Sequence, residues 1–80
     1  MRLDKYLKVS RLVKRRTIAN ELCDAKHVHV NGKAARASYE VKPGDEITIA
    51  VGPHKTRARV LTLNEHATKE SAAGMYEIVN

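Results

Sequence analysis

The first ten residues alternate apolar and basic positions with the period of an α-helix. At 100° per residue, the side chains suited to burial fall on one side of such a helix: Leu3, Tyr6, Leu7 and Ser10. The basic side chains spread over the opposite side: Arg2, Lys5, Lys8 and Arg11. Asp4 in the first turn suits the positive end of the helix dipole. The pattern predicts an amphipathic helix, followed by a turn at which Leu12 and Val13 enter the core.

A second helical pattern spans residues 15–25. Its small and apolar side chains fall on one arc: Ile18, Ala19, Leu22, Cys23 and Ala25. Polar side chains lie outside that arc: Thr17, Asn20, Glu21 and Asp24. Because only a few residues separate the two patterns, they predict a helix-turn-helix-like unit.

From residue 26 onward the period changes to that of β-strands. Residues 27–30 alternate polar and apolar, and Asn31-Gly32 follows, a pair that accepts the positive φ angles of a type I′ hairpin turn. Residues 33–38 read as a weak strand or a loop. Residues 42–45, with Pro second and Gly third, have the composition of a type II turn.

The rest of the chain predicts further extended segments. Residues 46–51 form a strand with these apolar side chains on one face: Ile47, Ile49 and Val51. The remaining elements are, in order, a strand within 55–63, a short helical turn within 67–73 and a last strand over 75–79. Two helices packed on a small, mostly antiparallel sheet make an α+β fold, and 80 residues form one domain.

Positive charge is concentrated at the start of the chain. Residues 1–16 hold seven Lys or Arg and one Asp, which accounts for the whole net charge of +6. The other 64 residues carry eight basic and eight acidic side chains and are neutral. A basic surface on a neutral scaffold is typical of proteins that bind polyphosphates.

Lys14, Arg15 and Arg16 stand at the predicted start of the second helix. Each cation there opposes the helix dipole at a cost of about 0.3–1 kcal/mol, in a domain with little stability to spare. An RNA phosphate removes the conflict, because free N–H groups and guanidinium groups both donate to its oxygens. The predicted RNA-binding residues are Arg2, Lys5, Lys8, Arg11, Lys14, Arg15, Arg16, Asn31 and Lys33. Lys5 and Lys8 are equally well explained as solvated lysines, and Arg2 as a partner of Asp4.

The sequence lacks the residue combinations of metal, disulfide or catalytic chemistry. Cys23 is the single cysteine and fits a small core residue, while His27 and His29 share an exposed strand face without a third ligand. The sequence has no glycine-rich phosphate loop, no Ser/His/Asp ordering with supporting context and no paired carboxylates that suggest a cleft. No apolar run reaches ten residues, so we expect neither a signal peptide nor a membrane span. We interpret the chain as a cytoplasmic non-enzyme that needs no cofactor and no metal.

Four blocks of the sequence, in this order, closely resemble the S4-type RNA-binding domain: Arg2–Leu7, Lys14–Ala19, Val28–Gly32 and Val41–Asp45. The resemblance covers residues 1–51, and we expect residues 52–80 to complete the same domain. In this family the two helices and the adjoining hairpin grip structured RNA. The resemblance therefore implies RNA contacts by Arg2, Lys5, Arg11, Lys14, Arg15, Arg16, Asn31 and Lys33.

The chain departs from the family pattern at two places. Many members carry Ser just before the second helix, where this chain has Lys14 and Arg15. Many also carry Gly before the third block, where this chain has residues 25–27, Ala-Lys-His. The first departure concerns the cap of the second helix, and the second concerns the conformation of the loop that follows it.

Residues 72–76 are similar to the small stand-alone members that act in ribosome quality control. That resemblance implies binding to obstructed large ribosomal subunits, with contacts to 23S rRNA and peptidyl-tRNA. It also implies support for the partner factor that adds C-terminal alanine tails to stalled chains. We expect a monomer that has no membrane partner.

Three other functions compete with this interpretation. A heat-shock-type S4 protein would recycle free large subunits. A helix-turn-helix DNA-binding protein would need base-reading side chains on the second helix, for which Thr17, Asn20 and Glu21 are poor material. A protein-interaction adaptor would use its neutral sheet rather than its basic end.

Overall fold

Two short helices lie side by side at the start of the chain. The computed structural model describes residues 1–79 and places α1 at Leu3–Val9 and α2 at Arg16–Asp24. The apolar side of α1 is buried as its spacing predicts, and the Ser10 hydroxyl donates to the Leu7 carbonyl at 3.3 Å. The predicted helix pair is therefore confirmed, with α2 beginning one residue later than its pattern suggested.

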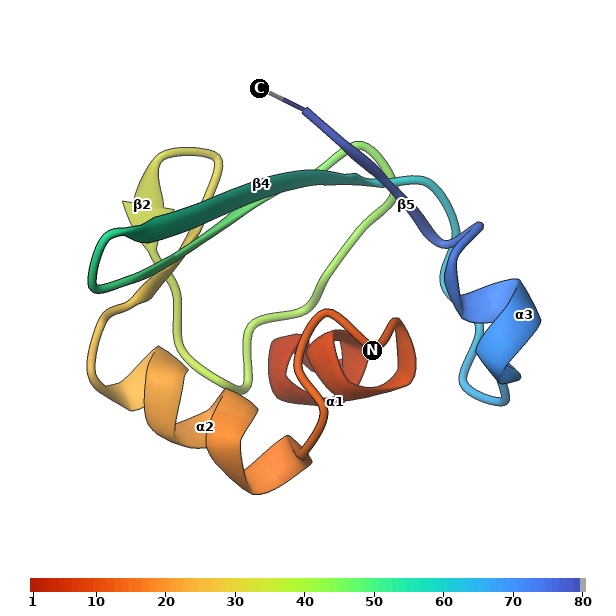
Figure 1. Ribbon diagram of the computed structural model, residues 1–80, viewed down its shortest axis with the longest axis horizontal. Coiled ribbons are helices and arrows are strands. Elements are labelled where there is room, and N and C mark those ends of the chain that lie inside the picture. Colours follow the sequence, from red (N-terminus) through yellow and green to blue (C-terminus); the bar gives the residue numbers. More distant parts are fainter. Residues whose placement is uncertain (80) are drawn as a thin grey trace.

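The rest of residues 1–79 contains a five-stranded sheet in which every neighbouring pair is antiparallel. Its strands in chain order are β1 (Val28–Val30), β2 (Lys33–Ala34), β3 (Glu46–Val51), β4 (His54–Val60) and β5 (Tyr76–Ile78). Their order across the sheet is β2-β1-β3-β4-β5, and a short helix, α3 (Lys69–Ala72), precedes β5. Figure 1 shows α1 and α2 on one side of this sheet. The fold is α+β, as predicted.

The turns follow the chemistry of their residues. Asn31 and Gly32 have φ angles of 52° and 86°, the two positive values that a type I′ hairpin requires. Gly44 has a φ of 94° at the third position of the predicted type II turn, which the bond from the Asp45 N–H to the Lys42 carbonyl closes at 3.1 Å.

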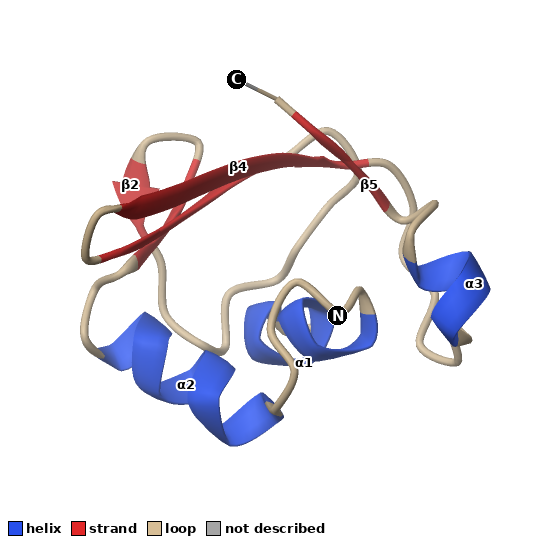
Figure 2. Cartoon of the chain, in the orientation of Figure 1, coloured by secondary structure: helices blue, strands red, loops and turns tan. Residues whose placement is uncertain are grey.

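The core lies between the sheet and the two helices, whose arrangement Figure 2 shows. Its largest fully buried side chains come from both layers: Leu3, Tyr6, Leu7, Val28, Ile47, Val60 and Met75. The Tyr6 hydroxyl donates to the Met75 carbonyl at 2.9 Å, which connects α1 to the segment that leads into β5. In the sheet, β4 and β5 continue directly from β3. Asn80, the last residue of the predicted 52–80 segment, lies outside the described residues.

Two apolar side chains of the sequence patterns remain exposed. Ile18 is 41% exposed, because the stripe that α2 buries runs through Ala19 and Cys23, and Ile18 lies about 100° away from Ala19. Val51 is 43% exposed, because it pairs with exposed His54 at the end of the β3–β4 hairpin. Residues 33–38, read as a weak strand or a loop, contain both: the first two form β2, and the segment then turns inward to bury Ala37.

Candidate nucleic-acid interface

One buried carboxylate joins the two helices of the basic region. Asp4 is 3% exposed, and its Oδ1 accepts the Lys5 backbone N–H at 2.8 Å and the Arg2 Nε at 3.2 Å. Its Oδ2 accepts the Asn20 side-chain amide at 3.4 Å and lies 3.5 Å from the Arg16 Nε. The chain start, α1 and α2 therefore converge on one side chain.

The environment of Asp4 keeps it ionised. Burial raises the pKa of Asp4, but hydrogen bonds from Asn20 and the Lys5 N–H, together with the charge of Arg16, more than offset this and leave the pKa below its ordinary 3.8. The side chains of Arg2 and Arg16 are each 48% exposed. Each guanidinium thus keeps donors free toward solvent while its Nε is held, which is a suitable arrangement for phosphate oxygens.

The start of α2 lacks a side-chain cap. Arg15 is the N-cap residue, with extended φ and ψ of −125° and 135°, and its side chain makes no capping bond. The first bond of the helix joins the Ala19 N–H to the Arg15 carbonyl at 3.0 Å, so the N–H groups of residues 16–18 precede the intrahelical ladder. Lys14 and Arg15 are exposed beside these donors. The expected departure from a serine cap is confirmed.

The other predicted residues of α1 differ in their surroundings. Lys8 is exposed in the last turn, whereas the Lys5 ammonium lies 3.3 Å from the Glu65 carboxylate and its side chain is 34% exposed. Arg11 is exposed just after the helix with a φ of 64°, a left-handed conformation that few residues with a Cβ adopt. Among residues 1–79, Lys5 is therefore the one of these three cations that forms an ion pair.

Asn31 and Lys33 lie on the β1–β2 hairpin, away from the start of α2. The Asn31 amide donates to Asp45 Oδ1 at 3.0 Å, and its Oδ1 accepts the Glu46 backbone N–H at 3.0 Å. Tyr39 also donates to Asp45, at 3.0 Å. The Asn31 side chain therefore fixes the hairpin against the loop that precedes β3. Lys33 is exposed on β2.

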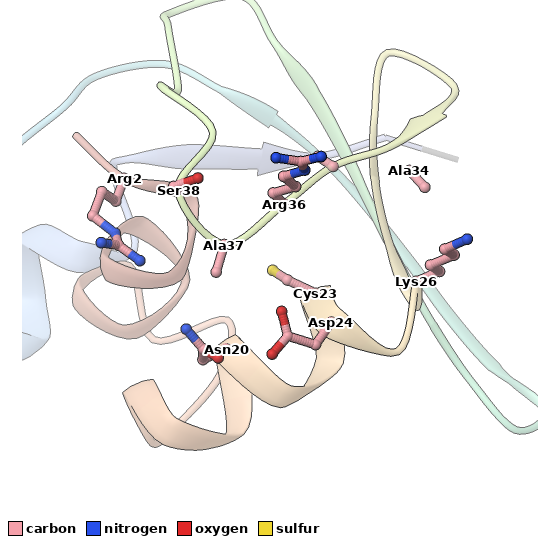
Figure 3. A pocket seen from close by; sticks show the side chains of 10 residues that line it. Arg2, Asn20, Cys23, Asp24, Lys26, Ala34, Arg36, Ala37 and Ser38 are labelled. Atoms are coloured by element: carbon pink, nitrogen blue, oxygen red, sulfur yellow. The ribbon is translucent and has the colours of Figure 1, made fainter.

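A groove of about 730 Å³ separates α2 from the segment after β2. Figure 3 shows side chains from both walls around it, with Cys23 and Asp24 on the helix and Arg36 and Ala37 on the opposite segment. Arg2 lies at one end of the groove. A neighbouring hollow of about 520 Å³ shares Arg36 and extends to Asn31 and Lys33. The groove and the hollow therefore connect the Asp4 cluster with the hairpin.

Sequence reasoning missed two basic residues of this groove, Lys26 and Arg36. Arg36 lies in residues 33–38, a segment whose sequence has no clear helix or strand period. Lys26 has a φ of 63° and follows the end of α2. Two backbone bonds close the helix there: the Lys26 N–H donates to the Cys23 carbonyl at 3.0 Å, and the His27 N–H donates to the Leu22 carbonyl at 2.9 Å. This is a Schellman motif, in which glycine is the usual residue at the position of Lys26. The absence of that glycine was the available signal.

The described residues offer little for other chemistry. Within residues 1–79, no three His, Cys, Asp or Glu side chains gather as metal ligands. No helix in that range is long and apolar enough to span a membrane. Burial raises the pKa of the Cys23 thiol to about 11, with Asp4 and Asp24 adding to the effect, so the thiol is protonated at neutral pH.

Comparisons with known proteins agree with the fold. The family model for the S4 domain matches residues 1–47. The RQC P-site tRNA stabilizing factor of Bacillus subtilis is 51% identical over 79 residues, which cover 99% of this chain and 92% of that protein. The factor of the same name from Streptococcus pneumoniae is 48% identical, covering 100% of this chain and 91% of that protein.

Among solved structures, the Vibrio cholerae Heat Shock Protein 15, described as trimeric, aligns with a TM-score of 0.90 and 28% identity. The alignment covers 99% of this chain and 81% of that one. The structural match agrees with the sequence matches over nearly the whole chain. The resemblance drawn from the four sequence blocks is therefore confirmed, and the chain belongs to the S4 domain family.

Proposed function

We propose that this protein is a ribosome quality-control factor that binds the large ribosomal subunit and stabilises a peptidyl-tRNA in the P site. The observation that carries the proposal is the convergence of Arg2 and Arg16 on buried Asp4, next to the uncapped start of α2. The relatives matched over nearly their full length are named RQC P-site tRNA stabilizing factor, and this name supports the ribosome and the P-site tRNA as binding partners.

The proposed mechanism is binding without bond chemistry. Asp4 holds Arg2 and Arg16 in place, and Lys14, Arg15 and the free N–H groups of α2 add donors to the same anionic backbone. The predicted contacts of Lys5, Lys8, Arg11, Asn31 and Lys33 extend this surface along α1 and the hairpin. Recognition relies on RNA shape and 2′-hydroxyl groups, because Tyr6 is fully buried and only the partly buried Tyr39 and Tyr76 remain among the tyrosines for stacking bases.

The proposed partners are 23S rRNA and a tRNA, which this small domain would contact at the same time. A domain with principal extents of 28 × 26 × 22 Å is wide enough to contact 23S rRNA on one side and a tRNA on another. By holding the peptidyl-tRNA in one geometry, a cytoplasmic monomer would support the factor that adds alanine tails to stalled chains. Recycling of free large subunits, the heat-shock-type alternative, would require binding that is independent of tRNA.

Co-sedimentation with large subunits carrying peptidyl-tRNA tests the proposal. The double variant Arg15→Ala with Arg16→Ala should lose binding, whereas Lys55→Ala with Lys69→Ala should bind like the wild type. The control removes the same charge from exposed positions on β4 and α3, distant in sequence from the helix pair. Loss of binding in both double variants would mean that only net charge matters.

Salt dependence and competition separate the remaining alternatives. If five to seven phosphates are contacted, affinity should fall by about three decades between 50 and 200 mM monovalent salt, and each lost arginine should reduce the slope by about one. Duplex DNA should compete poorly with ribosomal RNA, since Thr17 and Glu21 offer little for reading bases. Equal competition by DNA would contradict the ribosomal assignment. Retention of binding by the Arg15/Arg16 variant would favour a protein-interaction adaptor.

A further inference from the structure

Three charged side chains face the groove beside α2 without an intramolecular partner. Asp24, Lys26 and Arg36 all line it, yet within residues 1–79 none of these side chains forms a hydrogen bond or an ion pair. Opposite charges around one groove usually pair with each other or with nearby groups. Here they stay free while Arg2, at the end of the same groove, is held by Asp4.

Two of these residues also occupy locally unfavourable positions. Asp24 is the last residue of α2, where a carboxylate opposes the negative end of the helix dipole. Lys26 adopts a left-handed conformation that is strained for a residue with a Cβ. Local rules broken together around one groove are typical of a functional site.

The lining of the groove is suited to a nucleotide. Its inner surface contains the nearly buried, small side chains of Cys23 and Ala37, against which a flat base can lie. Arg2, Lys26 and Arg36 supply cations for a phosphate. The volume of about 730 Å³ is within the range of small-molecule sites.

We propose that this groove binds one unpaired nucleotide of the RNA, with guanine as the preferred base. The proposal rests on the RNA-binding function above and names a feature of its ligand. An ionised carboxylate only accepts hydrogen bonds. Guanine alone presents two adjacent donors, N1–H and N2–H₂, on its Watson–Crick edge, whereas the other three bases place an acceptor beside each donor. Asp24 therefore selects guanine, and an Arg36 guanidinium can bind the phosphate or stack on the base.

Binding to RNA hairpins that differ at a single position tests the proposal. The set comprises one fully paired hairpin and four versions with a single bulged G, A, C or U. The wild type should bind the bulged-G hairpin about fivefold or more tightly than the other three, the lower range for a two-donor base contact. Backbone amide spectra should show that 5′-GMP perturbs residues 24, 36 and 37.

Two variants and a control complete the test. Asp24→Asn should abolish the preference for G, and Arg36→Ala should weaken bulged hairpins more than the paired one. Glu70→Gln, the same change of charge at an exposed position on α3, should retain the preference. Equal affinity for all four bulges, or a G preference that survives Asp24→Asn, would overturn the proposal. If the G preference fails but the paired hairpin is still bound in a salt-dependent way, the guanine proposal is wrong and the proposed RNA-binding function stands. If the protein binds none of these RNAs, the guanine proposal and the proposed function are both contradicted.

Discussion

Replacing Asp4 by Asn separates the positioning of arginines from the simple effect of charge. The substitution raises the net charge from +6 to +7, so a binding surface that depends on charge alone should hold RNA more tightly. In the structure, however, the carboxylate accepts from Arg2 at 3.2 Å and lies 3.5 Å from the Arg16 Nε. Asn keeps the acceptor for the Lys5 N–H but loses the charge that holds both guanidinium groups.

The expected loss of affinity follows from the order that Asp4 imposes. Each long side chain that must be immobilised at the moment of binding costs about 0.5–1.5 kcal/mol. Two such side chains give about 1–3 kcal/mol, or roughly a 5- to 150-fold weaker Kd. Because both arginine side chains are half exposed, the loss of their ion pairs should lower the free energy of unfolding by only about 1 kcal/mol.

Fluorescence anisotropy with a labelled ribosomal RNA fragment measures this effect, and Glu65→Gln is its matched control. Glu65 pairs with Lys5 at 3.3 Å and is exposed, so its substitution adds the same charge without changing Arg2 or Arg16. We expect Glu65→Gln to bind RNA as tightly as the wild type or slightly more tightly. An Asp4→Asn protein that is folded and binds as well as Glu65→Gln would refute the positioning role of Asp4.

Three further predictions concern stability. Lys26→Gly should raise the free energy of unfolding by about 0.5–1 kcal/mol in chemical denaturation, because glycine relieves the left-handed strain at a smaller entropic cost, while Lys26→Ala should give no gain. The free energy of unfolding should fall as the pH drops below about 4. The folded-state pKa values of Asp4 and Asp45 lie below their ordinary 3.8, so in acid the unfolded chain binds protons that the folded chain does not. Unfolding measured as a function of pH should show a weaker fall in Asp45→Asn. Tyr6→Phe should lower the melting temperature through a loss of about 1 kcal/mol, because the Met75 carbonyl keeps its backbone partners; an unchanged melting temperature would contradict this bond.

Local patterns predicted the elements of this fold because their chemistry is local. The side chains that α1 buries, the two positive φ angles at Asn31-Gly32 and the turn before β3 all depend on residues close together in the sequence. Burial depends on what covers an element. Ile18 and Val51 fit the apolar pattern but remain 41% and 43% exposed, which periodicity alone could not show.

The candidate site was predicted in part for the same reason. Charge counting identified the basic residues of the first sixteen, and the Arg2–Asp4 pair is short-range in sequence. The bond from Asn20 to Asp4 spans sixteen positions, and the groove that includes Arg36 depends on how the segment after β2 folds against α2. Such contacts have no signature in a linear pattern.

The most direct test of the central claim is to sequence the RNA crosslinked to the protein in growing cells. The account predicts enrichment of tRNA and of 23S rRNA segments around the P site, and loss of this enrichment in the Arg15→Ala, Arg16→Ala variant. Crosslinks to chromosomal DNA, or ribosomal crosslinks that persist unchanged in that variant, would contradict it.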